Sequence, residues 1–520
     1  MRNDIVKKIY AILAAVIALV LALSGCAGKN KHEVDKKGGR YETIYLEMRA
    51  TSTLDPLKTD KKSVRDVLFL CYEPLFVLDE NLSPKGVIAK SWSINDECTS
   101  VTVSIKEDIF WHDGKKLTSK DVVYTVNKIK ETEDCAYAFL LKYVDSVQAV
   151  DSYTVRFNLS RKYAQFVYSL TFPILPSHKR SLVEQIDGSG AYMLDEYRQN
   201  DSLKLKKFNK WHGGDALTES IEVSVVRDAE AASALFSSGM LSAITSGSLD
   251  LGNYALKKDD ACIDYPAARY EYMVFNHSSG FFSSAGVRSA ISNAIDREKI
   301  VEECFGGHAS VSNIPLHPLA KNTAPSPTFS AYDMNAALEM LFYEGYTLNE
   351  KSGLLTNENG FSVSFRLLVN SDNPQRCRCA ELIASQLLKT GITVRIIYED
   401  YDNYMVRIQN GEYDAYLAGT QMGNIFDFEF LLSESGELNN YGYSGEYMEL
   451  ALSNIASSPS RDSLENAMLN FSEVFMREQP VCGIAFMKDS IVSKTVIKGV
   501  NPLLGMPFNG AAEWKILRNN

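Results

Sequence analysis

The sequence predicts a mixed α/β protein with more than one domain. Over residues 365–417, short apolar runs and amphipathic stretches follow one another in the order strand, helix, strand, helix, strand. Strands that are joined through a helix usually pair in parallel, so this order predicts a parallel sheet with crossover helices. Strictly alternating segments such as Val101–Ile105 indicate further strands that bury one face. The length of 520 residues is enough for two or three domains with complete cores.

Local patterns predict the other elements in order. Ile44, Leu46 and Met48 alternate with polar residues and predict an N-terminal strand. Residues 118–130 are expected to form a helix that Thr118 caps, with Asp121 near its positive end. Further strands are expected at 203–206 and 221–225, and further helices at 64–76, 229–236, 285–305, 335–343, 375–389 and 401–409.

Three smaller features receive structural interpretations. Gly188-Ser189-Gly190 is followed by a strand pattern rather than a helix, so it predicts a turn and not a phosphate-binding loop. Trp92 and Trp111 are expected to anchor the core. His112 and Asp113 are adjacent, and we interpret them as a surface turn rather than a catalytic dyad. Arg288 and Asp296, eight positions apart on the longest predicted helix, are expected to brace the fold.

The N-terminus has the features of an export signal. Fifteen apolar residues, Ile9–Leu23, follow Lys7 and Lys8 and end at Leu23-Ser24-Gly25-Cys26. A positive region, a short apolar core and small residues before a cleavage site are typical of a secretory signal peptide. The run is shorter than the roughly 20 residues of a membrane-spanning helix. Two kinds of signal fit this junction. In a lipoprotein signal Cys26 is the residue that matters, whereas in an ordinary signal peptide Cys26 is incidental.

Composition and charge exclude some classes of partner. The formal net charge is −11, and loss of residues 1–25 would leave 495 residues with a charge of −13, because that segment has three basic residues and one acidic residue. An acidic chain lacks the basic footprint of a nucleic-acid-binding protein. It also lacks the charge for adhesion to anionic lipid without an anchor. We therefore expect no nucleic-acid partner.

No catalytic or metal-binding signature is present in the sequence. It contains no H-E-x-x-H, G-x-S-x-G, Walker A or G-x-G-x-x-G motif, and its seven histidines are single residues away from metal-ligand spacing. Nine cysteines are present, and the eight other than Cys26 are widely scattered, unlike a small disulfide scaffold. We predict neither an enzyme, nor a cofactor, nor a metal site.

The order of the motifs resembles the family 5 extracellular solute-binding proteins of ABC importers, the dipeptide, oligopeptide and nickel group. The Leu-Ser-Gly-Cys26 junction is similar to the lipobox of bacterial lipoproteins, in which that cysteine is acylated. The segments that carry the family resemblance are Leu54–Pro56, Tyr72–Leu75, Ile88–Trp92, Ile105–Val123, Gly188–Tyr192, Asn209–Trp211, Val287–Arg297 and Tyr332–Leu341.

The resemblance implies a two-lobed periplasmic-binding-protein-like fold of type II, cluster C, with a hinge and an extra subdomain in the first lobe. It also implies an extracytoplasmic protein, tied to the cell membrane through lipid on Cys26, that works as a monomer with permease and ATPase subunits. The expected boundaries are a signal peptide at 1–25, a tether at 26–40, lobe I at 41–58, 183–275 and 496–520, the subdomain at 59–182, and lobe II at 276–495.

The resemblance also suggests residues that contact the ligand. Peptide binders of this family commonly hold the ligand's amine with an aspartate in a segment that aligns with residues 421–432. Here Gln421 takes the place of a tryptophan and Asn424 that of the aspartate, while Asp427 keeps a second acid. We expect ligand contacts at Gln421, Met422, Asn424 and Asp427, and cleft aromatics at Tyr137 and Phe139.

The ligand class stays open at this point. A di- or oligopeptide is the first hypothesis, although an amide at position 424 weakens the case for amine binding. A metallophore, an opine or a sugar on the same fold is the alternative, and bare nickel lacks a histidine cluster. A sensor or chaperone lipoprotein also fits the fold, whereas a secreted hydrolase lacks its catalytic residues.

Overall fold

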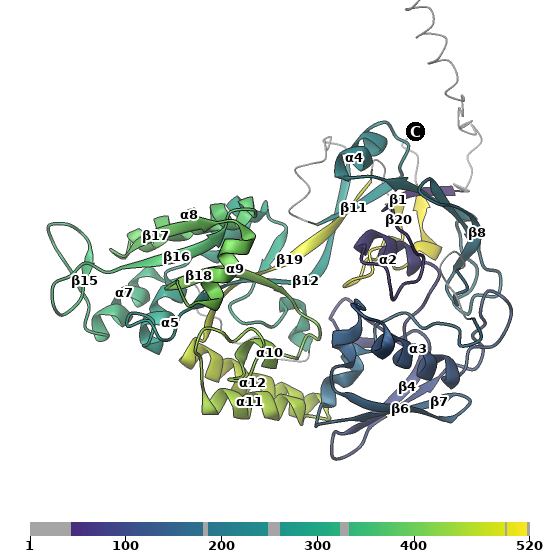
Figure 1. Ribbon diagram of the computed structural model, residues 1–520, viewed down its shortest axis with the longest axis horizontal. Coiled ribbons are helices and arrows are strands. Elements are labelled where there is room, and N and C mark those ends of the chain that lie inside the picture. Colours follow the sequence, from purple (N-terminus) through teal and green to yellow (C-terminus); the bar gives the residue numbers. More distant parts are fainter. Residues whose placement is uncertain (1–42, 180–185, 248–259, 323–331, 494–496, 517–520) are drawn as a thin grey trace, which may run out of the picture. The chain divides into compact units, whose positions relative to one another are not determined.

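The computed structural model describes residues 43–179, 186–247, 260–322, 332–493 and 497–516. These residues form two four-stranded sheets, one seven-stranded sheet and three two-stranded pairs, with helices packed against the larger sheets (Figure 1). The predicted mixed α/β class is therefore confirmed. The signal-like segment and Cys26 lie outside the described residues. None of the described helices is both long and apolar enough to cross a membrane.

The first four-stranded sheet contains the N-terminal strand. Its strand order is β1 (Thr43–Arg49), β10 (Ser220–Val226), β9 (Ser202–Lys207) and β8 (Tyr192–Arg198), with β1 parallel to β10 and the other pairs antiparallel. Ile44, Leu46 and Met48 are buried on one face of β1, as predicted. Side chains alternate along a strand, so Glu47 and Arg49 leave the opposite face. Helix α2 (Lys62–Leu68) packs against β1, and α4 (Ala229–Ser237) packs against β10.

The second four-stranded sheet is antiparallel throughout. Its order is β4 (Ala89–Ile94), β5 (Ser100–Ile105), β7 (Thr154–Leu159) and β6 (Val144–Asp151). Helix α3 (Ser119–Glu131) covers it, and Thr118 and Asp121 form a capping box at its start, which fits the predicted cap. Two short helices, η2 (Ala138–Leu141) and η3 (Ala164–Ser169), and the hairpin of β2 (Phe76–Leu78) and β3 (Pro84–Gly86) complete this region.

The seven-stranded sheet holds the predicted parallel strands. Its order is β11 (Ala243–Gly247), β19 (Val481–Ser493), β12 (Ala261–Phe275), β18 (Ala415–Gln421), β16 (Ser364–Asn370) and β17 (Thr393–Glu399), and β13 (Ala309–Val311) pairs with β19. Strand β16 is parallel to both β17 and β18. The connecting helices are α8 (Pro374–Leu388) and α9 (Tyr401–Gln409). The strand–helix order of this region was therefore predicted correctly.

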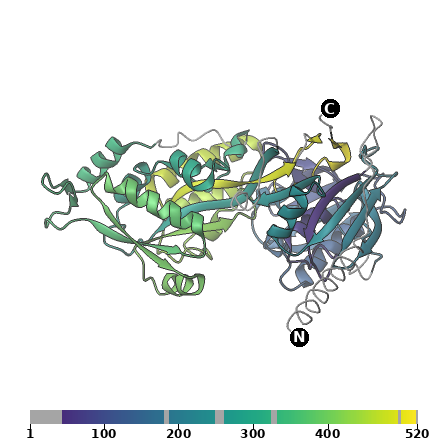
Figure 2. The same cartoon turned by 90° about the horizontal axis from the view of Figure 1, so that it is seen from above.

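Strands β12 and β19 are long antiparallel partners, visible as the teal and yellow strands in Figure 2. Their ladder is interrupted by a register shift between Pro266 and Tyr270. Proline has no N–H to donate, and bulges of this kind bend a strand and redirect its side chains. Residues 267–269 are thus released from the pairing with β19.

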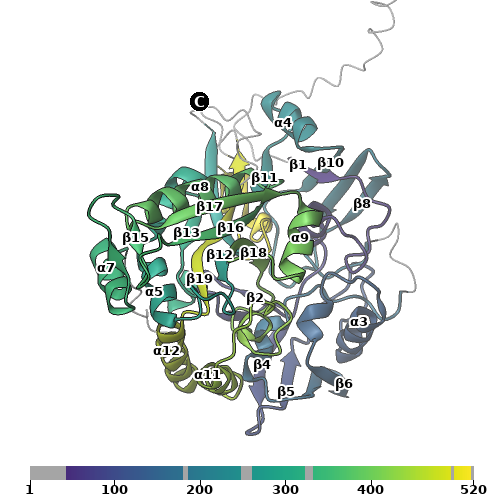
Figure 3. The same cartoon turned by 60° about the vertical axis from the view of Figure 1, so that its left-hand side comes forward.

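The remaining helices and short strands connect or follow the strands of these sheets along the chain. Helix α11 packs against α12 (Figure 3) and also contacts η3. The bounds are α5 (Ala285–Asn293), α6 (Arg297–Phe305), α7 (Met334–Tyr343), α10 (Glu429–Leu432), α11 (Glu446–Ala456), α12 (Arg461–Glu478), η5 (Pro318–Asn322), η6 (Ala511–Glu513), β14 (Thr347–Leu348), β15 (Leu355–Thr356), β20 (Ile497–Lys498) and β21 (Lys515–Ile516).

Three sequence-based expectations were wrong. The single helix expected over 285–305 is two helices, because Asp296 leaves the helical conformation and accepts a hydrogen bond from the N–H of Lys299 as the cap of α6. The helix expected over 64–76 is shorter and spans Lys62–Leu68, and Pro74 could not lie inside a helix without the loss of a backbone hydrogen bond. Trp92 is 39% exposed on β4, whereas Trp111 is fully buried as expected.

Several motif segments meet around the buried carboxylate of Glu73. It accepts hydrogen bonds from Ser189 Oγ at 2.8 Å, Trp211 Nε1 at 2.9 Å and His212 Nε2 at 3.0 Å. A Cβ atom at Gly188 would lie 1.8 Å from the carbonyl oxygen of Cys71, so only glycine fits this turn. The prediction of a glycine turn before strand β8 is confirmed, and these motifs hold distant segments together.

His112 belongs to the same junction and is not a free surface residue. Its Nδ1 accepts from the N–H of Gly188 at 3.1 Å, and its Nε2 lies 3.1 Å from the carbonyl oxygen of Gly190. Burial lowers the pKa of His112. The interpretation of His112 as a surface turn is corrected in this respect: the ring fastens the glycine turn to the Trp111 segment.

The predicted domain boundaries remain a prediction. Strand β12 falls in the expected lobe I, yet its residues Arg269–Phe275 pair with β18 of the expected lobe II. Its earlier residues pair with β19, which also pairs with β11. The long strands of this sheet therefore belong to both expected lobes.

Candidate functional site

Two adjoining cavities lie where β1, α2, β12 and the end of β18 meet. The first, which we call the charged cavity, has a volume of about 440 Å³. The second, which we call the apolar cavity, has a volume of about 400 Å³. Both volumes fall in the range of small-molecule sites. The residues that line both cavities are Lys62, Asp66, Ala268, Gln421, Leu504 and Gly505.

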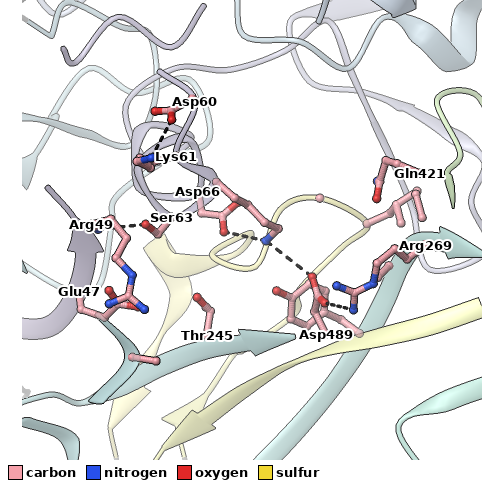
Figure 4. Close-up of a pocket in the computed structure, with 17 residues that line it drawn as sticks. Glu47, Arg49, Asp60, Lys61, Ser63, Asp66, Thr245, Arg269, Gln421 and Asp489 are labelled. Carbon is pink, nitrogen blue, oxygen red and sulfur yellow. Dashed lines mark hydrogen bonds and ion pairs between the residues drawn. The ribbon is translucent and has the colours of Figure 1, made fainter. Parts of the chain in front are cut away.

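The charged cavity is lined by four acidic and four basic side chains (Figure 4). Strand β1 supplies Glu47 and Arg49, and helix α2, which packs against β1, supplies Lys62 and Asp66. The bulge in β12 adds Ala267, Ala268 and Arg269. The acidic residues are Glu47, Asp60, Asp66 and Asp489, and the basic residues are Arg49, Lys61, Lys62 and Arg269.

Six of these eight charges are held in ion pairs. Lys61 Nζ lies 2.7 Å from Asp60 Oδ2. Lys62 Nζ lies 2.8 Å from Asp66 Oδ2 and 3.7 Å from Asp489 Oδ2. Arg269 Nη2 lies 3.4 Å from Asp489 Oδ1. Burial raises the pKa of Asp66 despite the attraction of Lys62.

Glu47 and Arg49 are the two charges outside these pairs. No ion pair within 4.0 Å involves either side chain among the residues that the structure describes. The Glu47 side chain is buried, with 7% of the residue exposed. Burial raises the pKa of the Glu47 carboxyl, while Arg49 opposes this shift. The two residues are two positions apart on β1 and therefore leave the same face.

The charged cavity also contains buried polar atoms without hydrogen-bond partners. Glu47 Oε2, Arg49 Nη1, Tyr265 Oη and Arg269 Nε are all inaccessible, and none has a partner among the described residues. Buried polar atoms are nearly always hydrogen-bonded, and an unsatisfied one costs about 1–3 kcal/mol. Four such atoms belong to residues that line one cavity, so water or a polar ligand that reached them would remove part of this cost.

The apolar cavity continues from the charged one. Its walls come from α2, the hairpin strand β2, the two short helices η2 and η3, the end of β18, and the segment 504–506. Its apolar lining includes Phe69, Val77, Leu78, Tyr137, Phe139, Leu140, Tyr168, Met422 and Ile425. The combination of an apolar half with a few convergent polar groups is typical of a ligand-binding site.

Four residues expected from the sequence line the apolar cavity: Tyr137, Phe139, Gln421 and Met422. Gln421 also lines the charged cavity. The N–H of Met422 donates to the carbonyl oxygen of Ala268 at 2.8 Å and so extends the pairing of β12 with β18. Phe139 is 53% exposed. Whether these side chains contact a ligand remains a prediction.

Asn424 and Asp427 line neither cavity. Asn424 is 5% exposed, and its Nδ2 donates to Gln165 O at 3.1 Å and to Ser169 Oγ at 2.9 Å. Asp427 Oδ1 accepts from the N–H of Glu429 at 3.3 Å. Burial raises the pKa of Asp427, and Glu429 adds to the shift. Their roles as ligand contacts also remain predictions.

Sequence reasoning missed Glu47, Arg49, Tyr265, Arg269 and Asp489 as site residues. The available signal was the pair of opposite charges at alternate positions of the N-terminal strand, which resembles an ordinary solvated face. The other three come from β12 and β19, more than 200 residues away in sequence. Only the folded chain brings them to the end of β1.

One group of possible metal ligands occurs in the described part of the chain. Asp113, His178 and Asp187 place a ligand atom each within 4.8 Å of one another. Lys179 Nζ lies 2.9 Å from Asp187 Oδ2 and 3.7 Å from Asp113 Oδ2. Lys115 Nζ also lies 3.8 Å from Asp113 Oδ2, so each carboxylate can pair with an ammonium, and the group is an ion-pair cluster that carries no metal assignment.

The chain matches known proteins over most of its length. Residues 83–441 match the family described as "Bacterial extracellular solute-binding proteins, family 5 Middle". The oligopeptide-binding protein AppA of Bacillus subtilis (strain 168) is 26% identical over 452 residues, with 81% of this chain and 82% of that protein covered. The glutathione-binding protein GsiB of Escherichia coli (strain K12) is 25% identical over 363 residues, with 67% of this chain and 68% of GsiB covered.

Solved structures share the fold at lower identity. A nickel ABC transporter protein from Bacillus halodurans has a TM-score of 0.78 at 17% identity. The match covers 92% of this chain and 100% of that protein. AppA from Bacillus subtilis in complex with a nonapeptide has a TM-score of 0.62 at 22% identity, with 92% and 100% covered. These structures support the two-lobed α/β fold of this chain. AppA and GsiB are named for the peptides that they bind, and the chain belongs to family 5 of the bacterial extracellular solute-binding proteins, which serve ABC importers.

Proposed function

We propose that the protein captures a peptide in the two adjoining cavities and delivers it to the permease of an ABC importer. The observation that carries this proposal is the joining of a charged cavity, with four unsatisfied polar atoms, to an apolar cavity of similar size. A peptide offers charged termini, polar backbone groups and apolar side chains in one molecule. Its relatives include binding proteins named for oligopeptides and for the tripeptide glutathione.

We further propose that the mature protein begins at Cys26 and is held at the outer face of the cell membrane by lipid on that residue. The apolar run Ile9–Leu23 and the Leu-Ser-Gly-Cys junction support this proposal. Two acyl chains give a durable anchor. A Cys26→Ser variant should move from the membrane fraction to the soluble fraction, and a variant that stays in the membrane fraction would contradict lipidation.

The peptide hypothesis is tested by ligand-induced stabilisation of the dialysed protein. A pool of peptides of two to eight residues should raise the melting midpoint, because a ligand that binds only the folded state stabilises it. A metallophore, an opine and a sugar serve as the competing classes. If one of these raises the midpoint and peptides do not, the peptide hypothesis is wrong. Mass spectrometry of co-purifying solutes provides an independent identification.

Asp427 provides a direct test of the contact inferred from family resemblance. If its carboxylate binds the amine of a peptide, Asp427→Asn should weaken binding by about tenfold or more, since a charge-assisted hydrogen bond is lost. Titration calorimetry with the best peptide of the pool measures the change. Unchanged affinity would show that Asp427, which lines neither cavity, does not bind the amine of the peptide.

A further inference from the structure

We propose that Glu47 and Arg49 together bind a complete amino-acid head group, with an ammonium and a carboxylate on the same carbon. This inference rests on the proposed function and names the chemical class of its ligand. Such a head group is present in free amino acids and in γ-linked peptides. An α-linked peptide lacks it, because its N-terminal ammonium is next to a neutral amide carbonyl.

The first argument is the charge balance of the cavity. Four acids and four bases line it, so it favours neither a net cation nor a net anion. Three acids and three bases already satisfy one another in ion pairs, which leaves one carboxylate and one guanidinium. A ligand that carries both charges would neutralise both of these residues at once.

The second argument is burial without a partner. Glu47 is more than nine-tenths buried, and both Glu47 Oε2 and Arg49 Nη1 are inaccessible and lack a partner among the described residues. A buried charge is costly unless it is paired and hydrogen-bonded. A carboxylate gives Arg49 both an opposite charge and a hydrogen-bond acceptor, whereas an amide carbonyl gives it only the acceptor. Charge-assisted bonds are about twice as strong as neutral ones.

The third argument is the spacing of the two residues. Two positions along a strand advance about 6.6 Å, and both side chains leave the same face of β1 (Figure 4). The two charged ends can therefore reach groups attached to a single carbon atom. The termini of an extended peptide lie farther apart and would require two separate sites.

The rest of the ligand would extend from this head group. Tyr265, which is 3% exposed, and Arg269 also line this cavity, and Tyr265 Oη and Arg269 Nε have no hydrogen-bond partner among the described residues. These groups suit the amide or carboxylate of a second residue. The residues that line both cavities connect this region to the aromatic side chains of the apolar cavity. A γ-linked dipeptide with an apolar second residue fits this arrangement.

Two isomeric dipeptides test the inference. γ-Glutamylphenylalanine and α-glutamylphenylalanine have the same composition and the same charges, but only the γ isomer has the complete head group. Titration calorimetry on the purified, dialysed protein should show that the γ isomer binds about tenfold more tightly, or better. Similar affinities for the two isomers would overturn the inference and leave the proposed peptide function intact.

Substitutions identify the residues responsible. Arg49→Met should weaken binding of the γ isomer about tenfold and change that of the α isomer much less, so the preference disappears. Arg49→Lys keeps a cation and should keep part of the preference. Glu47→Gln should weaken both isomers, since both carry the ammonium. The preference is a ratio measured on one protein sample, so it does not depend on how much of a variant folds.

Matched controls lie on the same sheet, away from both cavities. Arg198→Met on β8 and Glu222→Gln on β10 make the same chemical changes at side chains that pair with Glu196 and Lys204. Both variants should bind the two isomers as the parent does. A preference for the γ isomer that survives Arg49→Met would overturn the assignment to Arg49. The inference would also be overturned if neither isomer and no free amino acid binds. The melting experiment with the peptide pool tests the proposed function separately.

Discussion

Replacement of Arg288 by methionine should destabilise the fold strongly. Arg288 lies on α5 and is 4% exposed, and among the described residues its guanidinium donates to four backbone carbonyl oxygens. The acceptors are Gln479 at 3.0 Å, Glu478 at 2.6 Å, Phe282 at 2.7 Å and Ser283 at 3.0 Å. The side chain therefore ties the end of α12 to the segment that precedes α5. Burial lowers the pKa of Arg288 to about 10, which reflects the desolvation of its charge.

The size of the effect follows from two opposing contributions. A hydrogen bond to a charged group contributes about 1.5–3 kcal/mol, so four of them give about 6–12 kcal/mol. Removal of the guanidinium also relieves a desolvation cost of several kcal/mol. The net loss should be about 3–5 kcal/mol, in the range measured when one partner of a buried charged contact is deleted. Methionine keeps most of the apolar contacts of the arginine stem.

Urea unfolding followed by circular dichroism measures the loss. Arg198→Met provides the control, because this residue is on the surface of β8 and its side chain is 61% exposed. Its effect should stay below about 0.5 kcal/mol. Arg288→Lys should also destabilise the fold. A lysine ammonium cannot reach both the carbonyl oxygens before α5 and those at the end of α12, as the planar guanidinium does. If Arg288→Met changes the unfolding free energy no more than the control, the bracing role is refuted.

Three further predictions address pH, a buried carboxylate and thiol reactivity. Burial lowers the pKa of His277 and of His317 to about 4, from an ordinary 6.5. The unfolded chain therefore binds protons more readily, and stability should fall as pH drops from 6.5 toward 4. His317→Asn should flatten this decline in urea titrations, and an unchanged slope would contradict the assignment. Glu73→Ala removes the acceptor of three side-chain donors, of which Ser189 is buried and Trp211 and His212 are partly buried, and should cost about 2–4 kcal/mol of unfolding free energy, measured in the same way. Cys262 is the exposed thiol among the described cysteines, so maleimide should label it first in the native protein, and Cys262→Ser should abolish that fast phase.

The sequence predicted most of the fold because local patterns determine it. Alternation along β5 and the caps of α3 involve neighbours within four residues, so periodicity was sufficient for them. The break between α5 and α6 was missed because Asp296 serves there as a cap, whereas its position inside an apolar pattern suggested a continuous helix. Trp92 was misplaced because composition does not show which face of an edge strand meets the core.

The candidate site was harder to predict because its contacts are distant in sequence. Lys62 of α2 lies near Asp489 of β19, and Arg269 reaches the same carboxylate from the bulge in β12. No periodic pattern links residues that far apart. The charge pair Glu47 and Arg49 has the same pattern as an exposed strand face, and only the three-dimensional fold shows that it is enclosed. By contrast, the sequence indicated Gln421 and Met422, which line the apolar cavity, because a family motif marks the end of β18; their contact with a ligand remains a prediction.

The hydrogen bonds of Asn424 give this amide a structural role at the position where the family pattern has an aspartate. Both hydrogens of its amide are used, by the carbonyl oxygen of Gln165 and by Ser169 Oγ, while its Oδ1 accepts from the N–H of Phe426 at 3.0 Å. An aspartate at this position could not donate to the carbonyl oxygen of Gln165. Its carboxylate would also be almost completely buried.

Asn424→Asp should therefore destabilise the protein by about 2–4 kcal/mol at pH 7. A carboxylate oxygen would face the carbonyl oxygen of Gln165 without a hydrogen between them, and the new charge would be desolvated. Burial would raise the pKa of the new carboxyl, so the penalty is present above that pKa and shrinks as pH falls through it. Asn424→Ala, which buries no charge, should cost less and show no such pH dependence. Urea titrations at pH 7 and pH 5 compare the two variants. If Asn424→Asp keeps full stability and binds peptides more tightly, the amide is not required by packing, and position 424 would have the amine-binding role that the family resemblance suggests.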